Sequence, residues 1–168
     1  NCVILSDYGQ GVVYDSGAER IAEQAKKHSI PIIADPKLTG LHRTHEVDWI
    51  IFQSRGFELM KRRIGEADDY TAAKSLIESY GWKHLVVLAG GNGVTIYSQN
   101  EDTVHAPCTL PQLRQVIGLI DAAVVAIAVS ISNGFTVSDT ALLTNAACEC
   151  ILGAEATDSF SLSRNMLC

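Results

Sequence analysis

The sequence has few cysteines, and they follow no metal-binding or disulfide pattern. Its 168 residues include five cysteines and no CxxC pair, so a disulfide scaffold is not indicated. Cys148 and Cys150 lie two apart in an expected helix and face different directions, which disfavours a shared metal. We expect no metal ligands among these residues. We also expect reduced, mostly buried thiols and an intracellular location, in the cytoplasm or an organelle matrix.

Concentrated positive charge and long apolar runs are also missing. No basic cluster is larger than Lys61-Arg62-Arg63, and the formal net charge is −6. This balance argues against nucleic acid or an anionic membrane as a partner. The apolar run from Ala122 to Val129 is far too short to span a bilayer.

The elements that are present alternate between short apolar strands and helices. With 47% hydrophobic residues, the chain suits one globular domain over residues 1–168. Strand–helix alternation predicts an α/β fold with a mostly parallel sheet covered on both faces. Strands are expected at 2–6, 31–34, 49–52, 85–88, 94–97 and near 104. A first helix is expected from the capping-box sequence at 16–19 as far as Ala25. Further helices are expected at 55–64, 68–79 and 119–132, and a last one between a cap at Ser138 or Asp139 and an end at Gly153.

Two of these strands end at or just before an aspartate, Asp7 and Asp35. In open α/β sheets, ligands bind outside the carboxyl ends of the strands. That rule places Asp7, Asp35, Phe52 and Gly90 along one rim, where Asp121 would join them. The sequence therefore predicts a site at this rim.

Asp121 lies at the start of an unusually apolar helix. Helix N-termini attract phosphate because their free N–H groups and the helix dipole both favour negative charge. Asp121 is placed to take a proton from a hydroxyl that attacks a phosphoryl group bound there. The alternative is that Asp121 only decorates the first helical turn, a position that suits Asp equally well.

Five segments resemble the C-terminal half of PfkB/ribokinase-type carbohydrate kinases, most closely the heptose-7-phosphate kinase branch. Their order and spacing match along nearly the whole chain. The segments are SDYGQG at 6–11, PIIADPK at 31–37, LVVLAGGNG at 85–93, GLID at 118–121, and Asn145-Ala146-Ala147 with Gly153 and Thr157.

This resemblance implies a three-layer, Rossmann-like ribokinase fold and ATP-dependent phosphorylation of a sugar or sugar phosphate, with ATP and Mg²⁺ as cofactors. It implies Asp121 as the catalytic base and Gly118 as part of an anion cradle. Gly90, Gly93 and Asn145 would lie on the nucleotide side. Asp7, Asp35 and Lys37 would form the substrate rim.

Each of these assignments has a simpler alternative. A glycine at 118 also suits a helix start, and a Gly-rich hairpin turn at 90–93 needs no ligand. Asn145 suits a packing hydrogen bond, and Asp35-Pro36-Lys37 suits a turn with an exposed lysine.

The departures from the family pattern fall where phosphate and metal are expected. Leu119 and Ile120 replace a pair of small residues in the family signature GAGD. Gln53-Ser54 replaces a Pro-Asn pair, and Phe57 replaces a metal-linked Glu. These changes predict either a weakened kinase or a non-catalytic relative that serves as a structural or regulatory subunit.

The chain begins directly in a strand-like run, without an initiator Met. We expect it to be a piece of a longer product, in which a preceding half carries much of the sugar-binding site. The expected partners are nucleotide and sugar, together with that missing half or a separate protein.

Overall fold

A six-stranded mixed sheet forms the centre of the protein, as seen in a computed structural model that describes residues 1–6 and 17–155. The strands follow one another across the sheet in chain order. The first four pair in parallel, and the last two are antiparallel. They are β1 (Val3–Ser6), β2 (Ile32–Asp35), β3 (Trp49–Gln53), β4 (His84–Leu88), β5 (Val94–Ser98) and β6 (Val104–Ala106).

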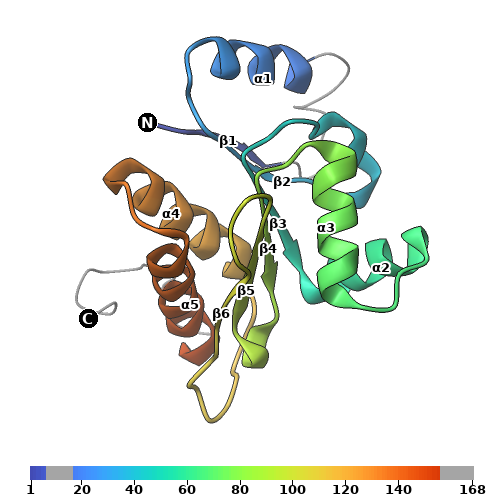
Figure 1. Cartoon of the computed structure of the whole chain (residues 1–168). Coiled ribbons are helices and arrows are strands. Elements are labelled where there is room, and N and C mark those ends of the chain that lie inside the picture. The colour runs from blue at the N-terminus through green and yellow to red at the C-terminus, as the bar shows by residue number, and fades with distance from the viewer. Residues whose placement is uncertain (7–16, 156–168) are drawn as a thin grey trace.

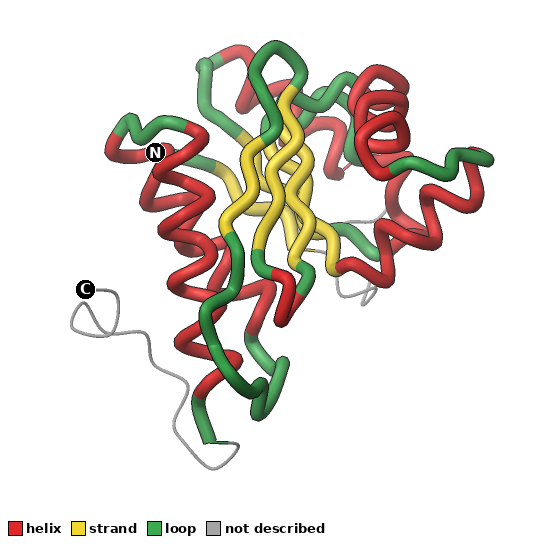
Figure 2. The backbone as a smooth tube through the Cα atoms, turned by 60° about the horizontal axis from the view of Figure 1, so that its bottom comes forward, coloured by secondary structure: helices red, strands yellow, loops and turns green. Residues whose placement is uncertain are grey.

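Helices cover both faces of this sheet (Figures 1 and 2). One face carries α1 (Gly17–Lys27), α2 (Ser54–Ile64) and α3 (Asp69–Tyr80), and the other carries α4 (Leu119–Asn133) and α5 (Val137–Gly153). Two short 3₁₀ turns, η1 (Leu38–Arg43) and η2 (Gly90–Asn92), connect strands. The predicted α/β architecture is confirmed.

The strand β3 shows why the strands read as continuous apolar runs. Ile50 and Phe52 pack with α2 and α3 in one core, whereas Trp49 and Ile51 pack with α4 and α5 in the other. Successive strand residues point to opposite faces, and both faces are covered. No residue in the middle of the strand therefore needs to be polar.

The helix ends follow the capping chemistry of the sequence, with one correction. Asp68 caps α3 by accepting a hydrogen bond from the Thr71 backbone N–H at 2.7 Å. Ser138 and Asp139 were the expected caps of α5, but the cap is Thr136, whose Oγ1 accepts from the Asp139 N–H at 3.1 Å. The helix starts earlier because Val137 is buried in the core against α4.

Along the described part of the chain, none of the helices has both the length and the apolarity that a bilayer crossing requires. The four cysteines in this part of the chain are all free thiols. Burial raises the pKa of the Cys148 thiol to about 12, so this residue is a structural side chain and not a reactive one.

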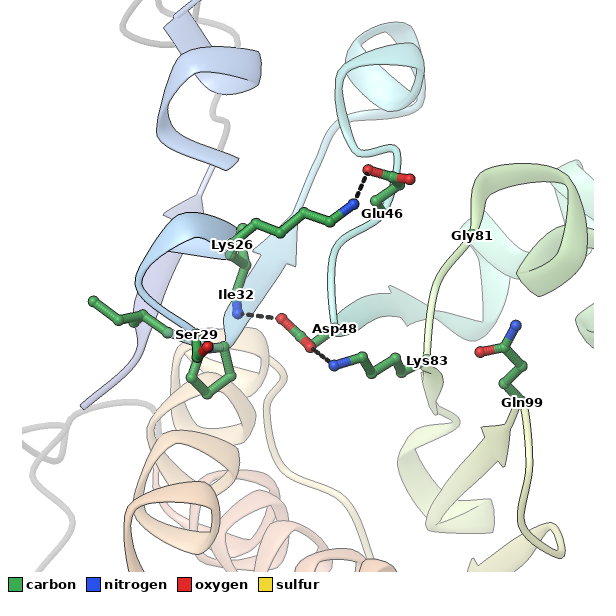
Figure 3. A pocket seen from close by; sticks show the side chains of 10 residues that line it. Lys26, Ser29, Ile32, Glu46, Asp48, Gly81, Lys83 and Gln99 are labelled. Atoms are coloured by element: carbon green, nitrogen blue, oxygen red, sulfur yellow. Dashed lines mark hydrogen bonds and ion pairs between the residues drawn. The ribbon is translucent and has the colours of Figure 1, made fainter. Parts of the chain in front are cut away.

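The amino ends of β2, β3 and β4 surround a cavity of about 470 Å³ (Figure 3). Its charges are satisfied within the protein. Lys26 pairs with Glu46 at 2.8 Å and Lys83 with Asp48 at 2.5 Å, and Asp48 also accepts the Ile32 N–H at 2.8 Å. These contacts join the three strand ends, and the cavity lies at the end of the sheet opposite the predicted site.

His84, at the start of β4, predicts a dependence of stability on pH. Its ring stacks on Trp49, and its Nδ1 contacts the Ser98 hydroxyl at 2.9 Å. Burial lowers its pKa from 6.5 to about 4, and the nearby Asp48 offsets this only in part. As the pH falls from 6.5 to 4, the unfolded chain takes up a proton that the folded protein resists. We expect the free energy of unfolding to fall by about 2 kcal/mol over this range.

Urea unfolding at several pH values would measure this effect. His84→Gln should flatten the slope between pH 6.5 and 4. His105→Gln is the control, because His105 is an exposed histidine on β6 that contacts the Thr95 hydroxyl. An equal slope in the native protein and in His84→Gln would contradict the assignment.

Candidate functional site

A cavity of about 340 Å³ lies at the carboxyl ends of β2 and β3, the end of the sheet that the topology rule selects. Asp35 ends β2, and the following Pro36 turns the chain out of the sheet because proline lacks an N–H for the strand ladder. Lys37, Arg55 and Ile120 contribute to the wall, from the loop after β2, the first turn of α2 and the first turn of α4.

Asp121 is the third residue of α4 and is exposed to solvent. It directly follows Ile120, which lines the same cavity as Asp35 and Lys37. The fold therefore brings the start of α4 and the end of β2 to one cavity. Asp7, the remaining predicted rim residue, lies outside the described residues.

Gly118 forms the N-cap of α4 in a left-handed conformation, with φ of 83°. Within the described residues, no side chain caps this helix end, and a Cβ added at Gly118 would meet nothing within 4 Å. Glycine is favoured at this position because of the positive φ, and not because a larger side chain would be crowded. None of the described residues therefore covers the first turn of α4 on the side of Gly118.

The two bulky residues that follow Gly118 have different surroundings. Leu119 is only 4% exposed and belongs to the core between α4 and the sheet. Ile120 is partly buried and forms part of the cavity wall. Only Ile120 therefore occupies space in the candidate site.

The glycine turn between β4 and β5 is shaped by the protein itself. Gly93 has φ of 86°, and a Cβ there would lie 2.0 Å from the carbonyl oxygen of Ala106. Gly90 also has a positive φ, 56°, but its Cβ would make only an ordinary contact with Leu113 at 3.7 Å. The glycine at 93 is thus required by the backbone that follows β6.

Asn145 and Glu149, one turn apart on α5, hold the segment after β6. The Asn145 side-chain amide donates to the Pro107 carbonyl at 3.1 Å and to Glu149 at 3.0 Å. Glu149 accepts from the Thr109 N–H at 2.6 Å and from its hydroxyl at 2.9 Å. Burial opposes ionisation of Glu149, but these hydrogen bonds outweigh it and lower its pKa. These are packing hydrogen bonds, the simpler alternative to a nucleotide-side role that the sequence offers for Asn145.

The described residues around the cavity do not form a magnesium site on their own. Mg²⁺ is held by carboxylate and other oxygen ligands, but Asp35 supplies the only carboxylate among the described residues of the cavity wall. Phe57 is 2% exposed in the core beside Tyr97, and the neighbouring Glu58 pairs with Lys61 at 2.7 Å. Within the described chain, no three His, Cys, Asp or Glu residues are grouped as metal ligands.

Sequence reasoning missed Arg55 at this site and did not indicate that Gln115 is buried. Arg55 lines the cavity, and its signal was a cation in the first turn of a predicted helix, where the dipole disfavours it. Gln115 precedes α4, and its side-chain amide is buried without a hydrogen-bond partner in the described structure. No sequence pattern indicates that an amide in a loop is buried.

Comparison with known proteins agrees with the geometry. The family model described as pfkB family carbohydrate kinase matches residues 3–164. The chain belongs to the pfkB family. Its relatives include the bifunctional protein HldE of Aliivibrio fischeri, 26% identical over 160 residues, which are 95% of this chain and 33% of the relative. This pfkB chain therefore spans about a third of that curated relative.

Solved structures show the same fold. A mutant of phosphofructokinase-2 from Escherichia coli superposes with a TM-score of 0.77 at 18% identity, over 89% of this chain and 50% of the other. Arabidopsis thaliana ribokinase complexed with ribose and ATP gives a TM-score of 0.75 at 18% identity, over 92% and 50%. The predicted ribokinase-like fold is confirmed for this pfkB chain.

Proposed function

We propose that the protein transfers a phosphoryl group from ATP to a hydroxyl group of a sugar or sugar phosphate. The observation that carries this proposal is the position of Asp121. It lies in the first turn of α4, next to a cavity wall that also includes Asp35 and Lys37. Membership of the pfkB carbohydrate kinases supports the reaction class.

In this proposal the helix start and Asp121 have separate roles. The N–H groups of the first turn of α4 bind the phosphoryl group, because they lack internal partners and the helix dipole favours an anion there. Asp121 accepts the proton of the attacking sugar hydroxyl as that oxygen forms its bond to the γ-phosphorus, while the bond from this phosphorus to the β–γ bridging oxygen breaks and ADP leaves. Asp35 and Lys37 orient the acceptor. Gly90, Gly93 and Asn145 are proposed to lie toward the nucleotide.

The acceptor to test first is a heptose 7-phosphate, because the residues that carry the family resemblance are closest to that branch. A coupled assay for ADP release, with product identification by ³¹P nuclear magnetic resonance, tests the reaction directly. Ribose and fructose 6-phosphate are the comparison acceptors. ATP-dependent phosphorylation of any of them supports the proposal, and its absence with all three contradicts it.

A second function has its own support. Ile120 forms part of the cavity wall, Phe57 is buried in the core, and the described residues around the cavity do not form a magnesium site. These features fit a non-catalytic member of the family that acts as a structural or regulatory subunit. Such a protein would elute with a partner in size-exclusion chromatography of native extracts and show no turnover.

A further inference from the structure

Two cationic side chains line the cavity at the carboxyl ends of β2 and β3. Lys37 follows β2, and Arg55 lies in the first turn of α2; both are exposed. Within the described part of the chain, neither side chain forms an ion pair or a hydrogen bond. The cavity therefore presents two cations that have no ion-pair partner among the described residues, beside the single carboxylate of Asp35, in a chain whose net charge is −6.

The position of Arg55 is unfavourable for a cation in the free protein. The N-terminus of a helix carries partial positive charge, which repels a cation in the first turn. The first turn of α2 contains no acidic residue, and Gln53 provides no side-chain cap. The basic residues Lys61, Arg62 and Arg63 lie in the last turn, where the same dipole attracts them. Arg55 therefore lies at the positive end of the α2 dipole, where a bound anion would offset the repulsion of its charge.

Among its described residues, the same cavity has a single carboxylate, that of Asp35. In phosphoryl transfer, metal ions neutralise the charge of the phosphate oxygens. Here Phe57 is in the core, Glu58 is paired with Lys61, and Asp35 is the carboxylate that remains on the described wall. The wall instead holds a guanidinium and an ammonium group.

We propose that Arg55 and Lys37 bind the phosphate of a ligand directly and without a divalent cation. Arg55 provides two parallel N–H donors to phosphate oxygens, and Lys37 adds a point charge. This inference deepens the proposed function by naming how the phosphate is bound, and it rests on that function only for the source of the phosphate. The phosphate belongs either to the nucleotide or to a sugar phosphate, since both carry the same recognised group.

Calorimetric titration of the purified protein with inorganic tripolyphosphate, in EDTA and in Mg²⁺, tests the proposal. Low ionic strength is needed because exposed charges are screened by salt. We expect binding in EDTA. We also expect it to weaken about tenfold or more in Arg55→Gln and in Lys37→Gln, since each removes a charged hydrogen-bond donor. Arg62→Gln is the matched control, because it removes the same charge from the other end of α2.

Thermal unfolding without ligand gives a second measurement, in which Arg55→Gln is expected to stabilise the protein although it weakens tripolyphosphate binding. Arg55→Gln should raise the melting temperature because it removes a cation from the positive end of the helix, whereas Arg62→Gln should not raise it.

Competition experiments with ATP and with sedoheptulose 7-phosphate separate the two phosphate sources. Competition of tripolyphosphate with ATP but not with the sugar phosphate assigns the site to the nucleotide, and the reverse assigns it to the sugar.

Binding only in Mg²⁺, or equal affinity in native protein and Arg55→Gln, overturns the inference. Turnover is measured separately, so the two proposals fail separately. A protein that phosphorylates a sugar but binds tripolyphosphate only with Mg²⁺ overturns this inference and leaves the proposed function standing. A protein that binds it in EDTA without any turnover supports the inference and contradicts the proposed function.

Discussion

Replacing Asp121 by Asn is expected to lower the rate of phosphoryl transfer on the order of 10²–10⁴-fold, the usual effect of losing a positioned general base. The amide has nearly the same shape but cannot accept the proton of the attacking hydroxyl. Asp121 is exposed in the first turn of α4, so the change should have little effect on folding. Steady-state kinetics with ATP and the sugar acceptor would measure the loss.

Asp139 offers a matched control for this substitution. It is the third residue of α5, as Asp121 is the third residue of α4, and it is also exposed. Asp139→Asn keeps the backbone N–H that donates a hydrogen bond to the Thr136 hydroxyl. It changes no residue of the cavity. Turnover should fall in Asp121→Asn and stay unchanged in Asp139→Asn. If both variants keep the native rate, Asp121 has no part in the reaction.

Local patterns were enough to predict most of the fold. The strand Trp49–Gln53 was recognisable as an apolar run, and Asp68 as a cap, because both depend on neighbours in sequence. The error at the start of α5 has a tertiary cause. The burial of Val137 against α4 moves the cap to Thr136, and no local pattern contains that contact.

The candidate site was less accessible to sequence reasoning. The topology rule placed Asp35 at the rim, and Lys37 follows it in the chain. Arg55 comes from a different strand–helix unit, so its presence in the same cavity depends on how β2 and β3 align. Ile120 and Leu119 are neighbours in sequence, yet one forms part of the cavity wall and the other lies in the core. That division depends on the rotation of α4 against the sheet, which a sequence motif does not specify.

Gly93 is expected to be the most sensitive glycine of the β4–β5 turn. Gly93→Ala should lower the free energy of unfolding by about 4 kcal/mol, from backbone strain together with overpacking. The strain arises because φ of 86° with ψ of −151° is a region that residues with a Cβ avoid. The overpacking arises because the new Cβ would lie 2.0 Å from the Ala106 carbonyl oxygen and 2.7 Å from the Cys108 nitrogen. Urea unfolding followed by circular dichroism would measure the change.

Gly90→Ala separates a structural role from a nucleotide-binding role in the same turn. Gly90 has φ of 56°, and its added Cβ would touch only a flexible leucine side chain at 3.7 Å, so the expected loss of stability is about 1 kcal/mol. If the turn contacts the nucleotide, Gly90→Ala should weaken ATP binding in a protein that remains folded. Equal destabilisation by Gly93→Ala and Gly90→Ala would show that the close approach of the backbone at residues 106–108 does not require a glycine at position 93. A much larger loss at Gly93 would show that this glycine is needed for packing whether or not a nucleotide binds.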